Sequence, residues 1–157
     1  MPGIDEIVRV GHVVSVNENH TVRVKFSDRD GMVSYDLPVL VPSTVDPQDY
    51  DLPAEQTPVV CLFLPNGQQQ GFVIGAYYSQ ANPPPVPNRH KHSRTFKDGT
   101  FIEYDQGTHT LTVSVAGPVH ITATGPVTIN GNLAVTGNIS AAGSITDAGG
   151  NTNHHSH

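Results

Sequence analysis

The sequence has little charge and almost no cysteine. Only 14% of its 157 residues are charged, against roughly 25% in an average soluble domain. Its one cysteine, Cys61, excludes an intrachain disulfide framework, and its neighbours in Val59–Leu64 favour a place in the core over a nucleophilic role. No apolar run reaches the roughly 18 residues of a transmembrane helix. The first residues also lack the basic and apolar regions of a signal peptide, so we expect a protein made in the cytoplasm.

The sequence also lacks the usual signatures of catalysis and of nucleic-acid binding. It contains no Gly-x-Ser-x-Gly, His-Glu-x-x-His, phosphate-binding loop or Cys-x-x-Cys pattern, and its carboxylates are scattered. The formal net charge is −6 and only ten residues are aromatic, whereas nucleic-acid-binding domains use basic grooves and stacking aromatics. We therefore expect no enzyme, no small-molecule substrate and no nucleic-acid partner, with a nucleic-acid-binding OB-fold kept as one alternative.

In the first 80 residues, short alternating or apolar runs separated by turn residues predict short strands. Two hairpins are expected, the second with a turn at Pro65-Asn66-Gly67, and one further strand lies between them. The predicted strands cover residues 8–16, 21–26, 35–41, 59–64 and 72–77. About five strands in so short a segment indicate a small closed barrel, with residues 42–58 as a long loop. A proline-rich linker, residues 81–94, follows this domain of residues 1–80.

The second domain, residues 95–150, opens with another hairpin signal, formed by residues 100–104 and 110–113. From Leu111 to Ile145, all 18 odd positions are aliphatic or glycine, and no even position holds a large aliphatic residue. A two-residue period kept for so long predicts one face that is buried throughout. The alternatives are an ordinary sheet in a monomer and a flexible glycine-rich tail.

A six-residue repeat lies within this stretch. Glycine recurs at Gly125, Gly131, Gly137, Gly143 and Gly149, and each unit continues with alternating polar and apolar residues. Fixed repeats of this kind indicate a β-solenoid or an intertwined β-helix. Four to five hexads make less than two coils of a single-chain helix, so we expect three chains, each supplying one face of a triangular prism.

In such a homotrimer the aliphatic residues meet on the threefold axis. The axial core is predicted to contain Val119, Ile121, Val127, Ile129, Leu133, Val135, Ile139 and Ile145. The predicted fold class is therefore all-β, a barrel followed by an intertwined triple-stranded β-helix formed by three chains.

Several segments resemble one known family. Gly11–Val16, Thr21–Val24, the hairpin of residues 58–79 and Asp98–Asp105 followed by His109–Val113 are similar to baseplate assembly protein V, the central-spike family of contractile phage tails and R-type bacteriocins. The resemblance covers nearly the whole chain. It implies an OB-fold collar, a trimeric β-helix and a pointed tip that pierces the host outer membrane when the sheath contracts.

The resemblance also implies partners and a location. The partners would be two further copies of the chain, the hub proteins of the baseplate and, transiently, the bacterial outer membrane. The protein would be assembled in the host cytoplasm and lie at the distal end of the tail tube of a virion or tail-like particle. A trimeric receptor-binding tail-fibre tip is the remaining alternative.

The last residues, 151–157, contain the candidate metal site. His155 and His157 are two positions apart, so both rings face the same way in an extended strand. Three chains would bring six imidazoles to one point on the axis, a donor set that suits an octahedral transition ion, whereas zinc normally takes four ligands. The family resemblance implies that the ion is one structural iron per trimer. His154 has the opposite parity, and His90 and His92 are expected in exposed linker.

Overall fold

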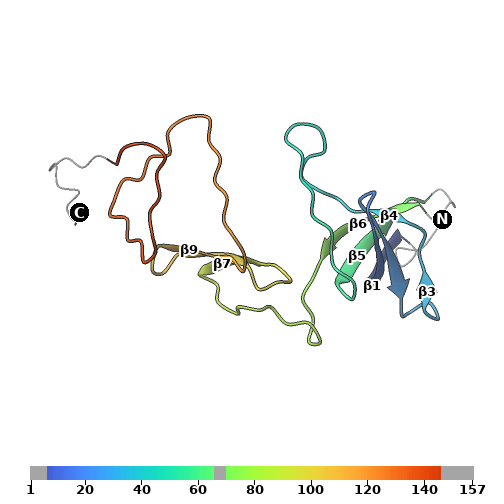
Figure 1. Cartoon of the computed structure of the whole chain (residues 1–157). Helices are drawn as coiled ribbons and strands as arrows, with labels where there is room; N and C mark the ends of the chain where they lie inside the picture. The colour runs from blue at the N-terminus through green and yellow to red at the C-terminus, as the bar shows by residue number, and fades with distance from the viewer. Residues whose placement is uncertain (1–6, 66–69, 146–157) are drawn as a thin grey trace. The chain divides into compact units, whose positions relative to one another are not determined.

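The protein is described by a computed structural model that covers residues 7–65 and 70–145. Over these residues the chain is all-β with almost no helix, and its strands form two antiparallel sheets (Figure 1). The all-β class predicted from the alternating pattern is therefore confirmed. In the part of the chain that is described, no helix has the length and apolarity needed to cross a membrane.

The first sheet contains six strands that come from the N-terminal part of the chain. They are β1 (Val8–Asn17), β2 (Thr21–Phe26), β3 (Met32–Val33), β4 (Leu37–Pro38), β5 (Pro58–Phe63) and β6 (Gly71–Ala76). The order is β3-β2-β1-β5-β6, and β4 also pairs with β2. Both predicted hairpins, β1 with β2 and β5 with β6, are present in antiparallel register.

Backbone pairing closes this sheet into a ring. Leu37 of β4 pairs with Val22 of β2, and two residues later Val39 forms a parallel bridge to Val73 of β6. The Leu40 amide also donates a hydrogen bond to the Val73 carbonyl oxygen at 2.9 Å. The segment predicted as one strand over residues 35–41 is thus split, because Pro38 lacks an amide hydrogen and the chain passes from one neighbour to another.

Among the described residues, those fully buried in this barrel are all apolar. These core residues are Val13, Val22, Val24, Phe26, Leu37, Val59, Cys61, Phe63 and Val73. Phe26 and Phe63 meet edge to face, with ring centres 5.9 Å apart, a favoured geometry for aromatic pairs. Burying each of these larger side chains contributes about 1.5–3 kcal/mol. As predicted, Cys61 is part of this core.

Gly11 allows β1 to approach β2 closely. A Cβ atom at this position would lie 2.5 Å from the Lys25 carbonyl oxygen and 2.6 Å from a Val24 methyl group. Any side chain here would therefore push β1 away from β2. The hairpin turn at the end of the same strand contains His20 with a φ of 61°, a left-handed conformation that is uncommon outside glycine.

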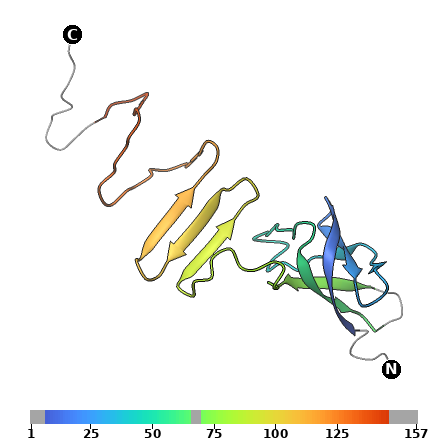
Figure 2. The same ribbon diagram turned by 90° about the horizontal axis from the view of Figure 1, so that it is seen from below.

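The second sheet has three strands in the order β7-β8-β9 (Figure 2). They are β7 (Lys91–Thr95), β8 (Phe101–Asp105) and β9 (Thr110–Ser114). The hairpin predicted from residues 100–104 and 110–113 corresponds to β8 and β9. In contrast, β7 begins at Lys91, inside the residues expected to be linker, so His92 is an exposed strand residue.

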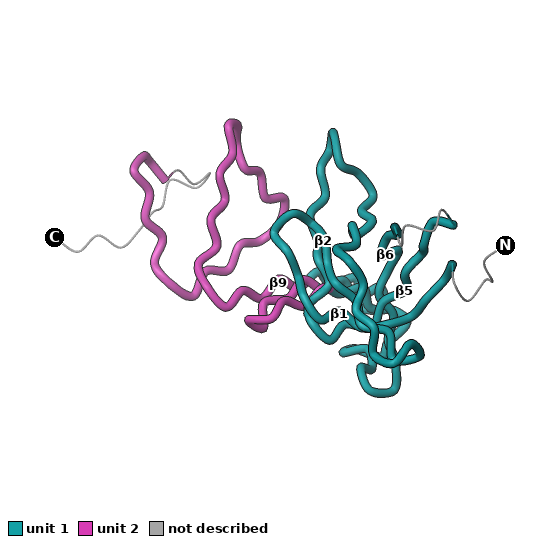
Figure 3. The backbone as a smooth tube through the Cα atoms, turned by 90° about the vertical axis from the view of Figure 1, so that its right-hand side faces the viewer, with its two compact units in different colours: residues 1–93, 103–111 teal, residues 94–102, 112–157 magenta. Residues whose placement is uncertain are grey.

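The chain divides into two compact units (Figure 3). One contains Met1–Ser93 with Glu103–Leu111, and the other contains Arg94–Ile102 with Thr112–His157. The division falls within the residues of β7, β8 and β9.

Candidate functional site

The aliphatic row of the repeat is exposed in the single chain. Residues 115–145 contain no strand, and every residue from 111 to 145 is solvent-exposed. The predicted axial residues range from 46% exposure at Val135 to 78% at Ile121. Between these limits lie Val119, Val127, Ile129, Leu133, Ile139 and Ile145. One chain therefore brings none of them into a common core, and the alternative of an ordinary sheet in a monomer is not what the structure contains.

Exposure on this scale is unusual for a water-soluble surface. A contiguous apolar patch of more than a few hundred Å² commonly marks an interaction site. The segment also carries no Asp, Glu, Lys or Arg between Leu111 and Ile145, and charge is what normally keeps an exposed segment solvated. In the described part of the chain, both the long apolar row and the uncharged polar row are thus exposed to solvent.

The glycines of the hexads are open on all sides. A Cβ at Gly125, Gly131, Gly137 or Gly143 would meet no atom within 4 Å. Within residues 7–65 and 70–145, no steric contact therefore explains the absence of side chains at these positions. Gly131 is different in one respect, because its φ of +146° falls in a region that side-chain-bearing residues rarely adopt.

The three-stranded sheet that precedes the repeat is held together by polar contacts. The Lys91 Nζ donates to Glu103 Oε1 at 2.7 Å, and both side chains are largely shielded from solvent, with exposures of 28% and 16%. This hydrogen bond to Glu103 raises the pKa of Lys91. The contact joins β7 to β8. It also gives the half-buried carboxylate of Glu103 a partner of opposite charge.

Asp98 and Asp105 organise the two turns of this sheet. Asp98 accepts hydrogen bonds from the backbone amide of Thr100 at 2.9 Å and from its hydroxyl at 3.1 Å. The amide contact lowers the pKa of Asp98. Asp105 accepts from the amide of Gly107 at 2.8 Å. Aspartates that bond to the backbone two residues ahead are typical of Asx turns, so these residues have a structural role here.

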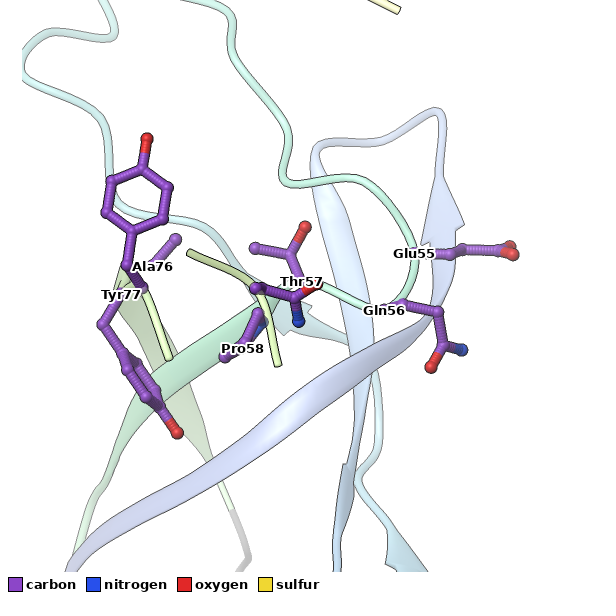
Figure 4. A pocket seen from close by; sticks show the side chains of 8 residues that line it. Glu55, Gln56, Thr57, Pro58, Ala76 and Tyr77 are labelled. Atoms are coloured by element: carbon purple, nitrogen blue, oxygen red, sulfur yellow. The ribbon is translucent and has the colours of Figure 1, made fainter. Parts of the chain in front are cut away.

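A pocket of about 430 Å³ lies on the barrel at the ends of β5 and β6 (Figure 4). Glu55 and Tyr77 lie at opposite ends of it, and Thr57, Pro58 and Ala76 lie between them. The pocket combines one carboxylate with hydroxyl and amide groups. Among the described side chains that line it, no nucleophile is hydrogen-bonded to a base.

The candidate tip site, His155 and His157, lies outside the described residues. Within residues 7–65 and 70–145, no group of three or more His, Cys, Asp or Glu side chains is placed to hold a metal ion. His90, which shares the two-residue spacing with His92, instead accepts a hydrogen bond from the Arg89 Nε at 3.1 Å.

No known protein-family model and no curated protein matches the chain.

The outer side of β1, β5 and β6 forms a further candidate surface, which was not predicted from the sequence. Val8, Val10, Leu62, Phe72 and Ile74 are between 36% and 52% exposed there. A signal was present in the sequence, since β5 is an unbroken apolar run, Pro58–Phe63. Such runs indicate strands that are covered on both faces, whereas alternation indicates one wet face.

Proposed function

We propose that the chain is the central spike of a contractile tail, a homotrimer that pierces the bacterial outer membrane. Each chain would contribute an OB-fold collar and one strand of an intertwined triple-stranded β-helix. The role is mechanical, without catalysis. The resemblance of the sequence to baseplate assembly protein V and the exposed repeat of residues 111–145 support this proposal.

One observation carries it: the aliphatic row of residues 111–145 is exposed in a single chain although its phase is unbroken. Transfer of a side chain such as Ile121 or Val127 from water into a core is worth about 1.5–3 kcal/mol. Eight such residues would make a monomer with this surface prone to association. Burial by two further copies removes the exposure, and three chains around one axis form a closed oligomer with no free edge.

The unusual chemistry of the even positions also fits a needle. Thr, Ser and Asn side chains are polar enough for an aqueous surface, yet the segment brings no Asp, Glu, Lys or Arg into the membrane. Charged side chains are the costly ones in hydrocarbon. Because the sheath supplies the force, the needle requires stiffness and a narrow section and no hydrophobic belt.

The ring of backbone pairing in the first sheet supports the OB-fold collar. Its strands are short, and residues 37–40 join β2 to β6. A closed barrel leaves few unpaired backbone groups at its edges. In a spike this domain would connect the needle to the hub proteins of the baseplate.

At the tip, His155 and His157 of three chains would supply six imidazole nitrogens. This donor set fits one octahedral iron ion, and six protein ligands leave no open position for a substrate, so the ion would be structural. Bound there, it would hold three chain ends together at the apex.

Native mass spectrometry of the untagged protein, purified without added metal, tests the proposal. Three copies of the 16.8 kDa chain give a trimer of about 50 kDa, with one iron ion bound. A trimer without metal would remove the tip site and keep the spike. A stable monomer would contradict the proposed function, because the exposed row would then be compatible with water.

A further inference from the structure

The outer side of the barrel carries an aligned apolar surface. Leu62 of β5 lies directly opposite Val8 of β1 on one side and Phe72 of β6 on the other, so one row of apolar side chains crosses three strands. Val10 lies opposite Val60, and Ile74 follows Phe72 on the same face of β6. We call Val8, Val10, Leu62, Phe72 and Ile74 the outer apolar face.

Strand β2 of the same barrel has one buried face and one face exposed to water, and it serves as a comparison. On β2, Val22, Val24 and Phe26 are buried, and the alternating outward residues Arg23 and Lys25 are exposed. Cross-strand neighbours are the unit that stabilises a sheet. The outward side chains of β2 are therefore charged. In contrast, the outward residue of β5, Leu62, is apolar.

Charge has been excluded from the outer apolar face. Arg9 is the only Asp, Glu, Lys or Arg in β1, β5 and β6. Its guanidinium carbon lies 4.5 Å from the ring centre of Phe63, an inward-facing core residue, so Arg9 is turned away from the outer face. A surface without charge can meet an identical surface without like-charge repulsion, even though each chain carries a net charge of −6.

We propose that the outer apolar face is a contact between copies of this chain, through which three barrels pack around the threefold axis. This inference rests on the proposed trimer. Once residues 111–145 hold three chains together, the effective concentration of the neighbouring barrels around each barrel is in the millimolar range. Each barrel therefore meets its two neighbours before it meets any other protein. The rotational symmetry of a trimer allows the same face of every barrel to turn toward the axis.

Cysteine cross-linking in the full-length chain tests this contact. Leu62→Cys is treated with a short bis-maleimide and compared with Lys25→Cys, which places the thiol on the charged outward side of β2. The native Cys61 can remain, because it is fully buried and burial raises the pKa of its thiol to about 11. We expect covalent dimers as the main product from Leu62→Cys and only background from Lys25→Cys.

A second variant separates the contact from the assembly of the needle. Val10→Cys should also cross-link, and adding Leu62→Glu should remove at least nine-tenths of that product while native mass spectrometry still shows a trimer. Leu62 is outward and 37% exposed, so the barrel itself tolerates this change.

The outcomes distinguish the two proposals. A trimer in which Leu62→Cys links no better than Lys25→Cys overturns the contact, assigns the face to a different partner such as a hub protein, and leaves the spike intact. Cross-linking in a species smaller than a trimer supports the contact and contradicts the spike. A monomer without cross-links overturns both.

Discussion

The guanidinium carbon of Arg9 lies 4.5 Å from the ring centre of Phe63, on the inner side of β1. A second ring, that of Phe26, is 5.8 Å away. The Arg9 Nε is buried and has no hydrogen-bond partner among the described residues. The contact of this cation with the barrel is therefore through aromatic faces, a favourable arrangement for arginine.

Arg9→Ala is expected to destabilise the barrel by about 1–2 kcal/mol, because both the cation–π contact and the packing of the aliphatic stem are lost. Labelling of the buried Cys61 reports barrel opening, and it should become roughly 5- to 30-fold faster. Arg23→Ala is the matched control, since Arg23 is 52% exposed and pairs with Asp36 on the surface. Its effect should stay within about 0.5 kcal/mol. Equal effects of the two substitutions would show that the ring contacts of Arg9 contribute nothing.

Cys61 itself predicts how the barrel responds to alkaline pH. Burial raises the pKa of its thiol from 9.0 to about 11. Between these values the unfolded thiol loses its proton while the folded one keeps it, so stability falls as the pH rises through this window, by on the order of 2–3 kcal/mol. Urea unfolding at pH 8 and at pH 11, monitored by circular dichroism, measures the loss.

Cys61→Ala provides the control for this prediction. The substitution lowers stability at both pH values because it leaves a small cavity, but it removes the part of the pH dependence that comes from the thiol. The same alkaline loss in this variant would assign the effect to other groups. Lys91, whose pKa is raised by its hydrogen bond to Glu103, contributes a loss of the same sign at higher pH.

A charge placed in the aliphatic row should prevent assembly. Val127→Asp would put a carboxylate on the axis next to two copies of itself, and burial of unpaired charges is far more costly than any single packing defect. We expect no trimer by native mass spectrometry. Thr128→Asp, one residue along with the opposite parity, should assemble normally. A soluble trimer of Val127→Asp would contradict the axial core.

The parts of the fold that could be predicted from the sequence are those whose residues pair and pack within a single chain. The hairpins β1–β2 and β5–β6 were predictable because the two strands of each pair with one another within one chain. The split of residues 35–41 was not predictable, because Pro38 pairs with β2 whereas the next residue, Val39, pairs with β6. For residues 111–145, periodicity predicted a buried face, and within the described residues of a single chain no surface covers it. The inward orientation of the Arg9 side chain could not be predicted, because β1 has valines at both even and odd positions and its inner face is therefore not evident from the sequence.

The tip makes a prediction that is independent of the barrel. His155→Ala and His157→Ala should each reduce iron from one ion per trimer to none, because either change removes three of six ligands at once. His154→Ala is the control of opposite parity and should retain the ion. Elemental analysis of the purified trimers measures the metal, and native mass spectrometry of the same samples measures assembly. Since eight aliphatic residues per chain are available to bury along the axis, the trimer should survive the loss of iron. Iron retained by both variants would place the ligands elsewhere, and a collapse to monomers would mean that the ion, and not the aliphatic row, holds the needle together.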